Sequence, residues 1–444
     1  MKVVSGLAEG RQALARDSFN ETQGQSPEIL AGIRRIFGSD LTVEEAVGRI
    51  LKDVSNNGDL AVRDYSSRID GTDSDILSLG RDEIRILAQD VPRDMIDALR
   101  RTAGRVREFH VASSPRPWID MEKGFGEIIV PMERVGIYVP GGSASYPSTV
   151  LMTAIPARVA GVKEIIIATP PSIGGSPNLD VLAAAALADV DRLFFIGGAQ
   201  AVGAMAYGTE SVPRVDMICG PGNIFVTTAK RMVYGQVGID GLEGPTETLI
   251  IADDTARPDF CAADMLGQAE HDLLATPVLV TTSKELANSV QTQIVKQLQS
   301  LGRKDTATKA LERRGVIVTL DTLDEALTLA NEYAPEHLCL MVKEPWASLG
   351  KIRNAGGIFL GEYSPEVMGD YIAGPSHVMP TGGTARFSSS LGIAQFVKRV
   401  PLVALDMPTT LRFANTAAML ARAEGLDAHA RSAEIRTEIQ SEGH

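Results

Sequence analysis

Two side chains that can bind a divalent metal lie three positions apart in the segment Asp264–Asp272, which reads DMLGQAEHD. Gln268 offers an amide oxygen and His271 offers an imidazole nitrogen. The segment follows the apolar run Thr248–Asp253, so the pattern predicts a strand, a loop and a helix that carries both residues on one face. Two ligands do not complete a metal site, and the rest of the chain has to supply the others.

Histidine is scarce in this chain, and four of its 6 histidines lie in polar motifs of the second half, each with a carboxylate nearby: His271, His337, His377 and His429. Carboxylates orient imidazole rings, tune their pKa and share metal sites with them. Asp370 could complete a set of glutamine, histidine and aspartate ligands, which suits Zn²⁺ or Mn²⁺ because thiolates are absent. No compact ligand motif joins these residues, so spacing alone leaves the metal site a hypothesis.

Glu336 and His337 stand side by side after a proline, where an apolar strand begins. Adjacent strand residues point to opposite faces, but at a strand end both can line the mouth of a crevice. Such a pair could supply two proton-transfer groups. The alternative is a solvated glutamate and a packed histidine, and the spacing does not decide between them.

Glycine-rich turns occur at three places where a strand is followed by a helix: Tyr138–Gly142, Gly197–Gln200 and Gly220–Asn223. Glycine lets backbone N–H groups approach a phosphate, and a helix N-terminus favours negative charge. None of the turns is a G-x-G-x-x-G motif followed by an acidic residue, and each alone could be a plain tight turn. Three in one module indicate a nucleotide-binding crevice at the strand ends.

The elements that position these residues alternate between strand and helix in two series, which begin near residues 126 and 247. This alternation predicts two Rossmann-like α/β/α modules with mostly parallel sheets, a helical N-terminal region and a small helical C-terminal region. Apolar runs of strand length are absent from the first 115 or so residues. The second series predicts these strands: Thr248–Ala252, Val278–Thr282, Val316–Leu320, Leu338–Val342 and Ile358–Leu360.

The composition is that of a globular protein, with 44% hydrophobic and 22% charged residues. The formal net charge of −13 disfavours nucleic acid and anionic membranes as partners. We expect no signal peptide, no transmembrane segment and a cytoplasmic location. The odd cysteine count predicts three buried free thiols, at Cys219, Cys261 and Cys339. The lone His110 is expected to be a surface or structural residue.

Taken together, the motifs resemble those of the histidinol dehydrogenase family from about Val47 to Arg436. The resemblance is carried by the three glycine-rich turns and by the segments Gly244–Asp253, Gln268–Asp272, Ala334–Leu338, Gly369–Thr381 and Glu424–His429. The family oxidises L-histidinol to L-histidine in two NAD-dependent steps through the aldehyde, at a zinc site in a homodimer. The resemblance therefore implies a histidine-biosynthesis enzyme with one Zn²⁺ per subunit.

The resemblance implies a role for each matching residue. Zinc would be held by Gln268, His271, Asp370 and His429, the last from the other subunit. Glu336 would activate water and His337 would be the general base. The expected substrate contacts are the zinc ligands, Glu336, His337, Thr246, His377 and Glu424. The expected NAD contacts are Tyr138, Gln200 and Asn223.

The same resemblance gives the expected domain boundaries. Residues 1–30 would form an N-terminal helical segment, and residues 31–134 and 246–390 a discontinuous first α/β module with the zinc and catalytic residues. Residues 135–245 would form the NAD-binding module. Residues 391–444 would form a C-terminal helical segment that completes the active site of the partner subunit.

Two positions depart from the family pattern: Thr246 stands where serine is usual, and Ser376 where asparagine often precedes the histidine. Threonine keeps the hydroxyl and adds a methyl group, which narrows the pocket. Relatives of the family oxidise other small alcohols, including a dihydroxypropane sulfonate, so a paralogous zinc- and NAD-dependent dehydrogenase is the alternative. Glu424 favours a cationic amine over a sulfonate.

Overall fold

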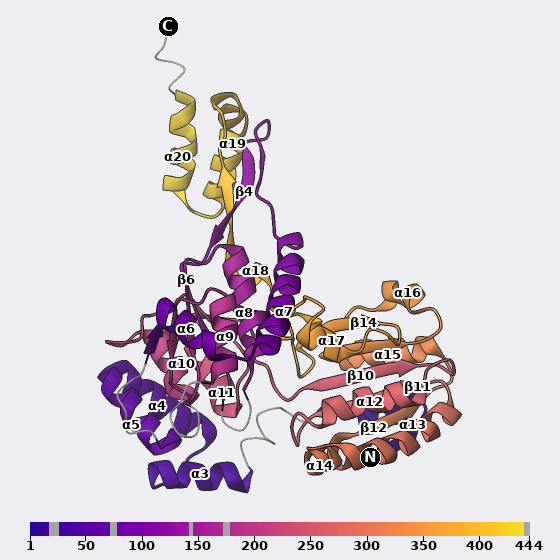
Figure 1. The fold of residues 1–444 in the computed structure, drawn as a ribbon. Coiled ribbons are helices and arrows are strands. Elements are labelled where there is room, and N and C mark those ends of the chain that lie inside the picture. The colour runs from indigo at the N-terminus through magenta and orange to yellow at the C-terminus, as the bar shows by residue number, and fades with distance from the viewer. Residues whose placement is uncertain (17–25, 72–77, 142–144, 172–177, 439–444) are drawn as a thin grey trace. The chain divides into compact units, whose positions relative to one another are not determined.

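The computed structural model describes residues 1–16, 26–71, 78–141, 145–171 and 178–438. Contacts divide the chain into two compact units, unit 1 with Met1–Ser114 and Met132–Phe396, and unit 2 with Pro115–Pro131 and Val397–His444. Gly142, the last residue of the first predicted glycine-rich turn, lies outside the described residues. The predicted α/β class is confirmed, because unit 1 contains two predominantly parallel sheets (Figure 1).

Sheet I is a six-stranded sheet with the order β2-β7-β6-β5-β8-β9, in which only β2 runs antiparallel to its neighbour. Its strands are β2 (Ser78–Gly80), β5 (Arg134–Tyr138), β6 (Glu164–Ala168), β7 (Arg192–Phe194), β8 (Met217–Cys219) and β9 (Gly238–Ile239). The chain leaves β5 on one side for β6 and β7, and continues on the other side with β8 and β9. The topological switch point of this Rossmann-like sheet therefore lies between β5 and β8.

Alternate residues of the strands in sheet I point to opposite faces, and helices cover both faces. Val135 and Ile137 pack among α6–α9, whereas Tyr138 and Ile166 pack among α3–α5, α10 and α11. The helices are α3 (Pro27–Phe37), α4 (Val43–Asn57), α5 (Asp59–Asp70), α6 (Arg81–Leu87), α7 (Arg93–Ala112), α8 (Pro147–Ala160), α9 (Leu179–Leu187), α10 (Gly198–Tyr207) and α11 (Ile224–Val233), with a 3-10 turn η1 (Ala88–Asp90).

Sheet II is fully parallel, with the order β1-β12-β11-β10-β13-β14. Its strands are β1 (Lys2–Ser5), β10 (Glu247–Ala252), β11 (Thr276–Thr281), β12 (Val316–Thr319), β13 (His337–Met341) and β14 (Gly357–Leu360). The five strands predicted for this series are thus confirmed, with ends shifted by at most two residues. The switch point lies between β10 and β13, where Thr248 is in register with His337.

The two faces of sheet II also pack in two separate hydrophobic cores. Ile250 packs among α12–α14, and its neighbours Leu249 and Ile251 pack among α1 and α15 on the other face. The helices are α1 (Leu7–Ala13), α12 (Pro258–Ala269), α13 (Lys284–Gln297), α14 (Lys304–Arg314), α15 (Leu323–Tyr333), α16 (Pro345–Ser348), α17 (Glu366–Tyr371) and α18 (Ile393–Phe396), with the 3-10 turns η2 (Leu298–Ser300), η3 (Leu349–Lys351) and η4 (Thr384–Arg386).

The first 115 residues differ from the expectation of a purely helical region. The strands β1 and β2 lie in this region, and each is a short edge strand of a sheet whose other strands come later in the chain. An edge strand buries few side chains, so it leaves no apolar run in the sequence. The helices between residues 27 and 112 share their cores with residues 135–237, whereas the expected boundaries group residues 31–134 with 246–390.

Unit 2 contains an antiparallel sheet with the order β15-β4-β3, formed by β3 (Trp118–Asp120), β4 (Phe125–Pro131) and β15 (Val397–Val403). Two helices, α19 (Met407–Ala423) and α20 (Asp427–Glu438), pack against each other and account for the expected C-terminal helical segment. Within the described ranges of both units, no helix combines the length and apolarity needed to cross a bilayer.

The cysteine prediction is confirmed, because Cys219, Cys261 and Cys339 are free and buried. His110 is buried in α7, and its ring nitrogens have no hydrogen-bond partner among the described residues. It is therefore a packed structural histidine rather than a surface one.

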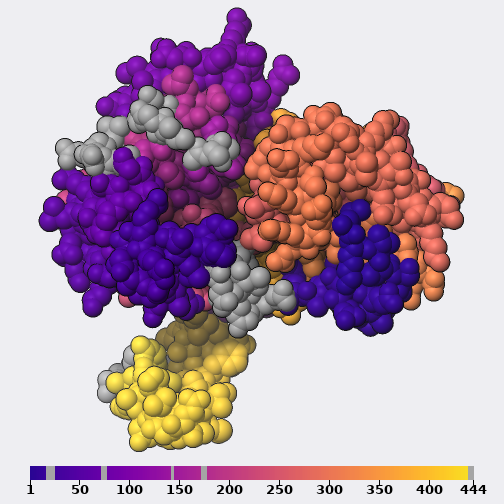
Figure 2. Space-filling view, turned by 90° about the horizontal axis from the view of Figure 1, so that it is seen from below, coloured from indigo at the N-terminus to yellow at the C-terminus, as the bar shows by residue number. Residues whose placement is uncertain are grey.

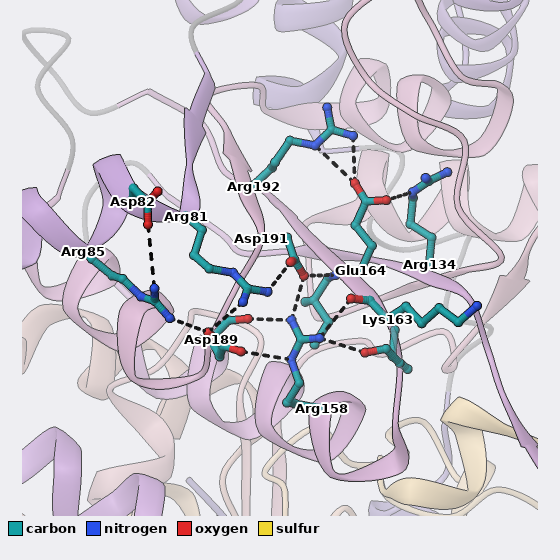
Figure 3. Close-up of polar contacts among 12 residues, drawn as sticks. Arg81, Asp82, Arg85, Arg134, Arg158, Lys163, Glu164, Asp189, Asp191 and Arg192 are labelled. Carbon is teal, nitrogen blue, oxygen red and sulfur yellow. Dashed lines mark hydrogen bonds and ion pairs between the residues drawn. The ribbon is translucent and has the colours of Figure 1, made fainter.

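Ion pairs link the amino ends of three neighbouring strands of sheet I, β5, β6 and β7 (Figure 3). Glu164 begins β6 and accepts hydrogen bonds from Arg134 Nε at 2.6 Å and Arg192 Nη2 at 2.8 Å, the residues that begin β5 and β7. Two of these strands, β5 and β7, are followed by glycine-rich turns at their other ends, so the network fixes strands that position those turns.

Asp191 is another acid of this network, with three partners. Its carboxylate accepts hydrogen bonds from Ile165 N at 2.8 Å and Arg158 Nη2 at 2.6 Å, and it also pairs with Arg81. Burial raises the pKa of Asp191, but these hydrogen bonds outweigh burial and hold its pKa below the usual value. The charged form therefore stabilises the folded state.

We expect Asp191→Asn to lower the free energy of unfolding by roughly 1–3 kcal/mol at pH 7, because it weakens charge-assisted hydrogen bonds to partly buried donors. The folded pKa is depressed, so this stabilisation is present above the unfolded pKa and is lost as the pH falls through the folded pKa. Urea unfolding at pH 7 and at low pH measures both effects. Asp82→Asn is the control, because Asp82 is exposed and 3.7 Å from Arg85; equal losses in the two variants would contradict the expectation.

Candidate active site

Glu336 and His337 lie at the amino end of β13, at the switch point of sheet II. Helix α15 ends at Tyr333, Ala334 takes a left-handed conformation with φ 51°, and Pro335 leads into the strand. This short turn brings the pair beside the start of β10, and both side chains are buried. The solvated-glutamate alternative is therefore excluded.

The backbone of Glu247 holds both residues of the pair. Its N–H donates to Glu336 Oε2 at 2.9 Å, and its carbonyl oxygen lies 3.1 Å from His337 Nδ1. A carbonyl only accepts, so Nδ1 carries a proton and Nε2 of the neutral ring carries the lone pair. Nε2 is buried, has no hydrogen-bond partner among the described residues and lies 3.4 Å from Asp370 Oδ1. With Nδ1 anchored in this way, Nε2 is the ring nitrogen that could exchange a proton with a bound molecule.

The surroundings of the pair shift both pKa values upward. Burial raises the pKa of Glu336 to about 7, against the opposing effects of His337 and the hydrogen bonds from Thr246 and Glu247. Burial lowers the pKa of His337, but the carboxylates of Glu336, Asp370 and Glu366 outweigh it and raise that pKa above its usual value. A positive charge bound at these carboxylates would weaken their field and free His337 to accept a proton.

A chain of hydrogen bonds connects Glu336 to Gln268, which is 1% exposed. Thr246 Oγ1 donates to Glu336 Oε2 at 2.7 Å and accepts from Gln268 Nε2 at 2.6 Å. Thr248 Oγ1 lies 3.0 Å from Gln268 Oε1 and also contacts Glu366. The amide of Gln268 is therefore oriented from both ends, and the hydroxyl of Thr246 is occupied on both sides.

Glu366 is a site residue that the sequence analysis missed. It is buried at the start of α17, and burial raises its pKa to about 8 against the effects of His337 and Thr248. A signal for it exists in the sequence, because Glu366 stands four residues before Asp370 and shares a helix face with it.

His271 lies differently from the expectation. Helix α12 ends at Ala269 and Glu270 caps it, so His271 is in the turn that follows rather than on the helical face. The helix stops there because the chain turns at Asp272–Ala275 to enter β11. His271 N donates to Gln268 O at 3.3 Å, so the two candidate ligands remain neighbours, and the His271 ring is exposed.

Asp370 and His377 are joined through the backbone. His377 Nδ1 lies 3.0 Å from the carbonyl of Asp370, and its Nε2 lies 3.3 Å from Thr149 Oγ1 in the first turn of α8. Both ring nitrogens of His377 thus contact protein atoms, which makes it an anchor for Asp370. Ser376 accepts a hydrogen bond from Val378 N at 3.2 Å and is buried. Burial raises the pKa of Asp370, but His337 and the other histidines outweigh it and keep this carboxylate ionised.

The donor set of Gln268, His271 and Asp370 suits a borderline metal such as zinc, because it offers oxygen and nitrogen without thiolate. The charge of Asp370 acts on His271 and raises its pKa, against the larger effect of burial, which lowers it. No cluster of three or more His, Cys, Asp or Glu side chains that could hold a metal ion occurs among the described residues. His429 and Glu424 lie in unit 2, where both are exposed.

The glycine-rich turns follow β5, β7 and β8, at the carboxyl ends of the strands in sheet I. Tyr138 Oη accepts a hydrogen bond from Gly198 N at 3.1 Å, and Gln200 Nε2 lies 3.4 Å from Asp70 Oδ2. Gln200 Oε1 is buried and has no partner among the described residues. Asn223 is exposed, and its side-chain oxygen caps α11, so its amide nitrogen remains for a ligand.

A buried ion cluster, also missed by the sequence analysis, holds the Gly220 turn. Lys230 is 1% exposed, and its Nζ lies 2.5 Å from Asp240, 2.8 Å from Glu243 and 3.0 Å from the carbonyl of Gly220. Asp240 also accepts the N–H of Gly220 at 2.7 Å. Gly220 has φ +105°, and a Cβ there would stand 2.2 Å from the carbonyl oxygen of Tyr138.

We expect Gly220→Ala to lower the thermal unfolding midpoint much more than Gly235→Ala. Gly235 has a similar φ of +101° but open space around its Cβ position, so its substitution adds only backbone strain of about 1 kcal/mol. Gly220→Ala adds a clash with the backbone of β5. Calorimetry of both variants measures the difference, and equal shifts would show that close packing at this turn is unimportant.

The family model described as histidinol dehydrogenase matches residues 34–437. The chain is 47% identical to a histidinol dehydrogenase from Dehalococcoides mccartyi (strain CBDB1), over 99% of this chain and 100% of that protein. It is 49% identical to one from Thermus thermophilus, over 91% and 97% of the two chains. A crystal structure of histidinol dehydrogenase from Elizabethkingia anophelis matches with a TM-score of 0.90 and 33% identity, over 99% of each chain.

Proposed function

The chain belongs to the histidinol dehydrogenase family, and we propose that it oxidises L-histidinol to L-histidine through L-histidinal, with two NAD⁺ reduced per substrate. The observation that carries the proposal is the buried pair Glu336–His337, which the Glu247 backbone holds with His337 Nε2 unpartnered. Each oxidation of an alcohol or aldehyde hydrate needs one group that accepts a hydroxyl proton while a hydride leaves.

The first step removes a proton from the hydroxyl of histidinol and a hydride from the adjacent carbon. His337 Nε2 would accept this proton, and its Nδ1–H would stay bonded to the Glu247 carbonyl. The products are the aldehyde, NADH and one proton. Water then adds to the aldehyde, and Glu336, whose pKa is raised by burial to about 7, is suited to remove a proton from that water. The resulting hydrate loses a hydroxyl proton and a second hydride, the hydride passing to NAD⁺, and yields the carboxylic acid.

Zinc would be held by Gln268, His271, Asp370 and His429, and when bound it would orient the amino alcohol and neutralise the nearby carboxylates. The oriented amide of Gln268 and the ionised Asp370 support this assignment. Tyr138, Gln200 and Asn223 would contact NAD, supported by their place at the carboxyl ends of sheet I. Because His429 and Glu424 are exposed in unit 2, they are free to reach the site of a second chain in a homodimer.

A cytoplasmic location is part of the proposal, and three free buried thiols fit a reducing compartment. The alternative substrate is another small hydroxy compound, such as a dihydroxypropane sulfonate. The hydroxyl of Thr246 makes two hydrogen bonds within the protein, so the change from serine preserves the network around Glu336. This observation favours L-histidinol.

We expect the purified protein with zinc and NAD⁺ to form about two NADH per L-histidinol, because both oxidations occur at one pair of proton-transfer groups. Absorbance of NADH against limiting substrate measures the ratio. Dihydroxypropane sulfonate is the comparison substrate. No NADH from L-histidinol, or faster turnover of the sulfonate, would refute the substrate assignment.

We expect Glu336→Gln and His337→Asn to affect different steps. His337→Asn should lower kcat by about 10²–10⁴-fold with L-histidinol, because the base is lost, whereas zinc content stays near that of the wild type. Glu336→Gln should slow the oxidation of added L-histidinal more than that of L-histidinol, because it impairs water activation. Single-turnover NADH formation and metal analysis measure these effects, and loss of zinc from His337→Asn would mean that its role is metal binding.

A further inference from the structure

The first 16 residues of the chain form part of the module that contains the catalytic pair. Strand β1 pairs with β12, and Leu14 packs in the core that α15 and β13 also line. Gly10 packs so closely on Val318 that a Cβ there would stand 2.9 Å from its side chain. In Figure 2 this segment is the indigo patch on the orange surface of the sheet II module. The segment precedes residue 34, where the match to the family model begins.

Arg16, the last described residue of this segment, contacts two residues, Glu247 and Tyr333. Its guanidinium pairs with both carboxylate oxygens of Glu247, with Nη2 at 2.9 Å from Oε2. The same Nη2 donates to the carbonyl oxygen of Tyr333 at 2.8 Å, and Cζ lies 3.9 Å from the centre of the Tyr333 ring. A planar guanidinium is suited to such simultaneous contacts, whereas an ammonium group is not.

Both partners of Arg16 belong to backbone segments that position the catalytic pair. Glu247 is the residue whose N–H and carbonyl hold Glu336 and His337. Tyr333 is the last residue of α15, and only Ala334 and Pro335 separate it from Glu336. Arg16 thus fixes the start of β10, which positions the pair. It also fixes the end of α15, which comes just before the pair in the chain.

Arg16 also compensates a buried charge. The Glu247 side chain is 8% exposed, and its negative charge acts on Glu336, whose pKa it raises. Its ion pair with Arg16 compensates that charge. Without Arg16, a buried carboxylate would remain unpaired next to Glu336.

We propose that Arg16 is a positioning residue for catalysis, which holds Glu247 and Tyr333 so that the Glu336–His337 pair keeps its geometry and charge. The proposal rests on the proposed function, which assigns the proton-transfer roles to this pair. Arg16 contacts neither of the two side chains directly and acts through the Glu247 backbone and the α15 terminus. The mechanism predicts an effect on turnover rather than on binding.

The experiment compares Arg16→Met with Arg11→Met in the zinc-loaded protein. Arg11 belongs to the same segment and pairs with Glu332 of α15 at 2.6 Å, but neither residue of that pair contacts Glu247. We expect Arg16→Met to lower kcat by roughly tenfold to a hundredfold, because small displacements of reacting groups have effects of this size. The KM values for L-histidinol and NAD⁺ and the zinc content should stay near those of the wild type, and Arg11→Met should leave kcat unchanged.

Two further readouts separate positioning from general stability. Arg16→Lys keeps the charge but cannot reach Glu247 and Tyr333 together, so its kcat should be intermediate; this variant also serves if Arg16→Met fails to fold. The rise of kcat with pH should move to higher pH in Arg16→Met, because the unpaired Glu247 carboxylate raises the pKa of Glu336 further.

The results that would refute the Arg16 proposal differ from those that would refute the proposed function. If the wild type oxidises L-histidinol while both Arg16 variants match it in kcat, the Arg16 proposal fails and the function stands. Equal losses of kcat in the Arg16 and Arg11 variants, or a loss of zinc in Arg16→Met at unchanged pH dependence, would assign the segment a structural role and overturn the proposal. If the wild type does not oxidise L-histidinol, the proposed function fails, and the role of Arg16 fails with it.

Discussion

The candidate site depends on the backbone of one residue, Glu247. Its N–H and its carbonyl lie at the start of β10, in register with the start of β13, and they bind a carboxylate and an imidazole that are adjacent in sequence. A β-strand places neighbouring side chains on opposite faces, so Glu336 and His337 can act together only because they stand at the strand end and are both tied to this backbone. The tautomer of His337 follows from the same contact, because a carbonyl oxygen accepts and does not donate.

Around the Glu247 backbone the protein arranges several acids in a buried space. Glu336, Glu366 and Asp370 all act on His337, and together they raise its pKa. Such a cluster of carboxylates is unfavourable without positive charge, and a metal ion and a cationic substrate are suited to compensate it. The buried carboxyl groups therefore agree with the proposed zinc and amino alcohol, and Glu247, a further carboxylate near the pair, is paired with Arg16.

Much of the fold could be predicted from the sequence because buried parallel strands leave continuous apolar runs. The five strands predicted from residue 248 onward occur within two residues of their predicted ends. The strands β1 and β2 could not be predicted, since edge strands bury little and are defined by partners that lie far away in sequence. Helix α12 ends before His271 because the chain turns into β11. The helical periodicity of the sequence does not show where this turn begins.

The candidate site was predictable only in part, for a similar reason. Glu336, His337, Gln268 and Asp370 belong to recognisable segments, and the structure places them on the amino-terminal side of sheet II. Arg16 and Lys230 could not be found from spacing, because each acts through contacts with residues that fold onto it from elsewhere: 231 positions away for Arg16 and Glu247. Glu366 is intermediate, since its spacing from Asp370 is informative but its burial is not visible in the sequence.

The central claim is that the Glu247 backbone fixes His337 as a base with its lone pair on Nε2. Nitrogen-15 NMR of the histidine rings in the zinc-loaded protein tests this claim directly, because the chain has only 6 histidines and the His337→Asn spectrum identifies the signals of His337. At a pH where the ring is neutral, we expect Nδ1 to carry the proton and Nε2 to be bare. A protonated Nε2 with a bare Nδ1 would contradict it, since such a ring could not donate to the Glu247 carbonyl or accept a proton from the substrate through Nε2.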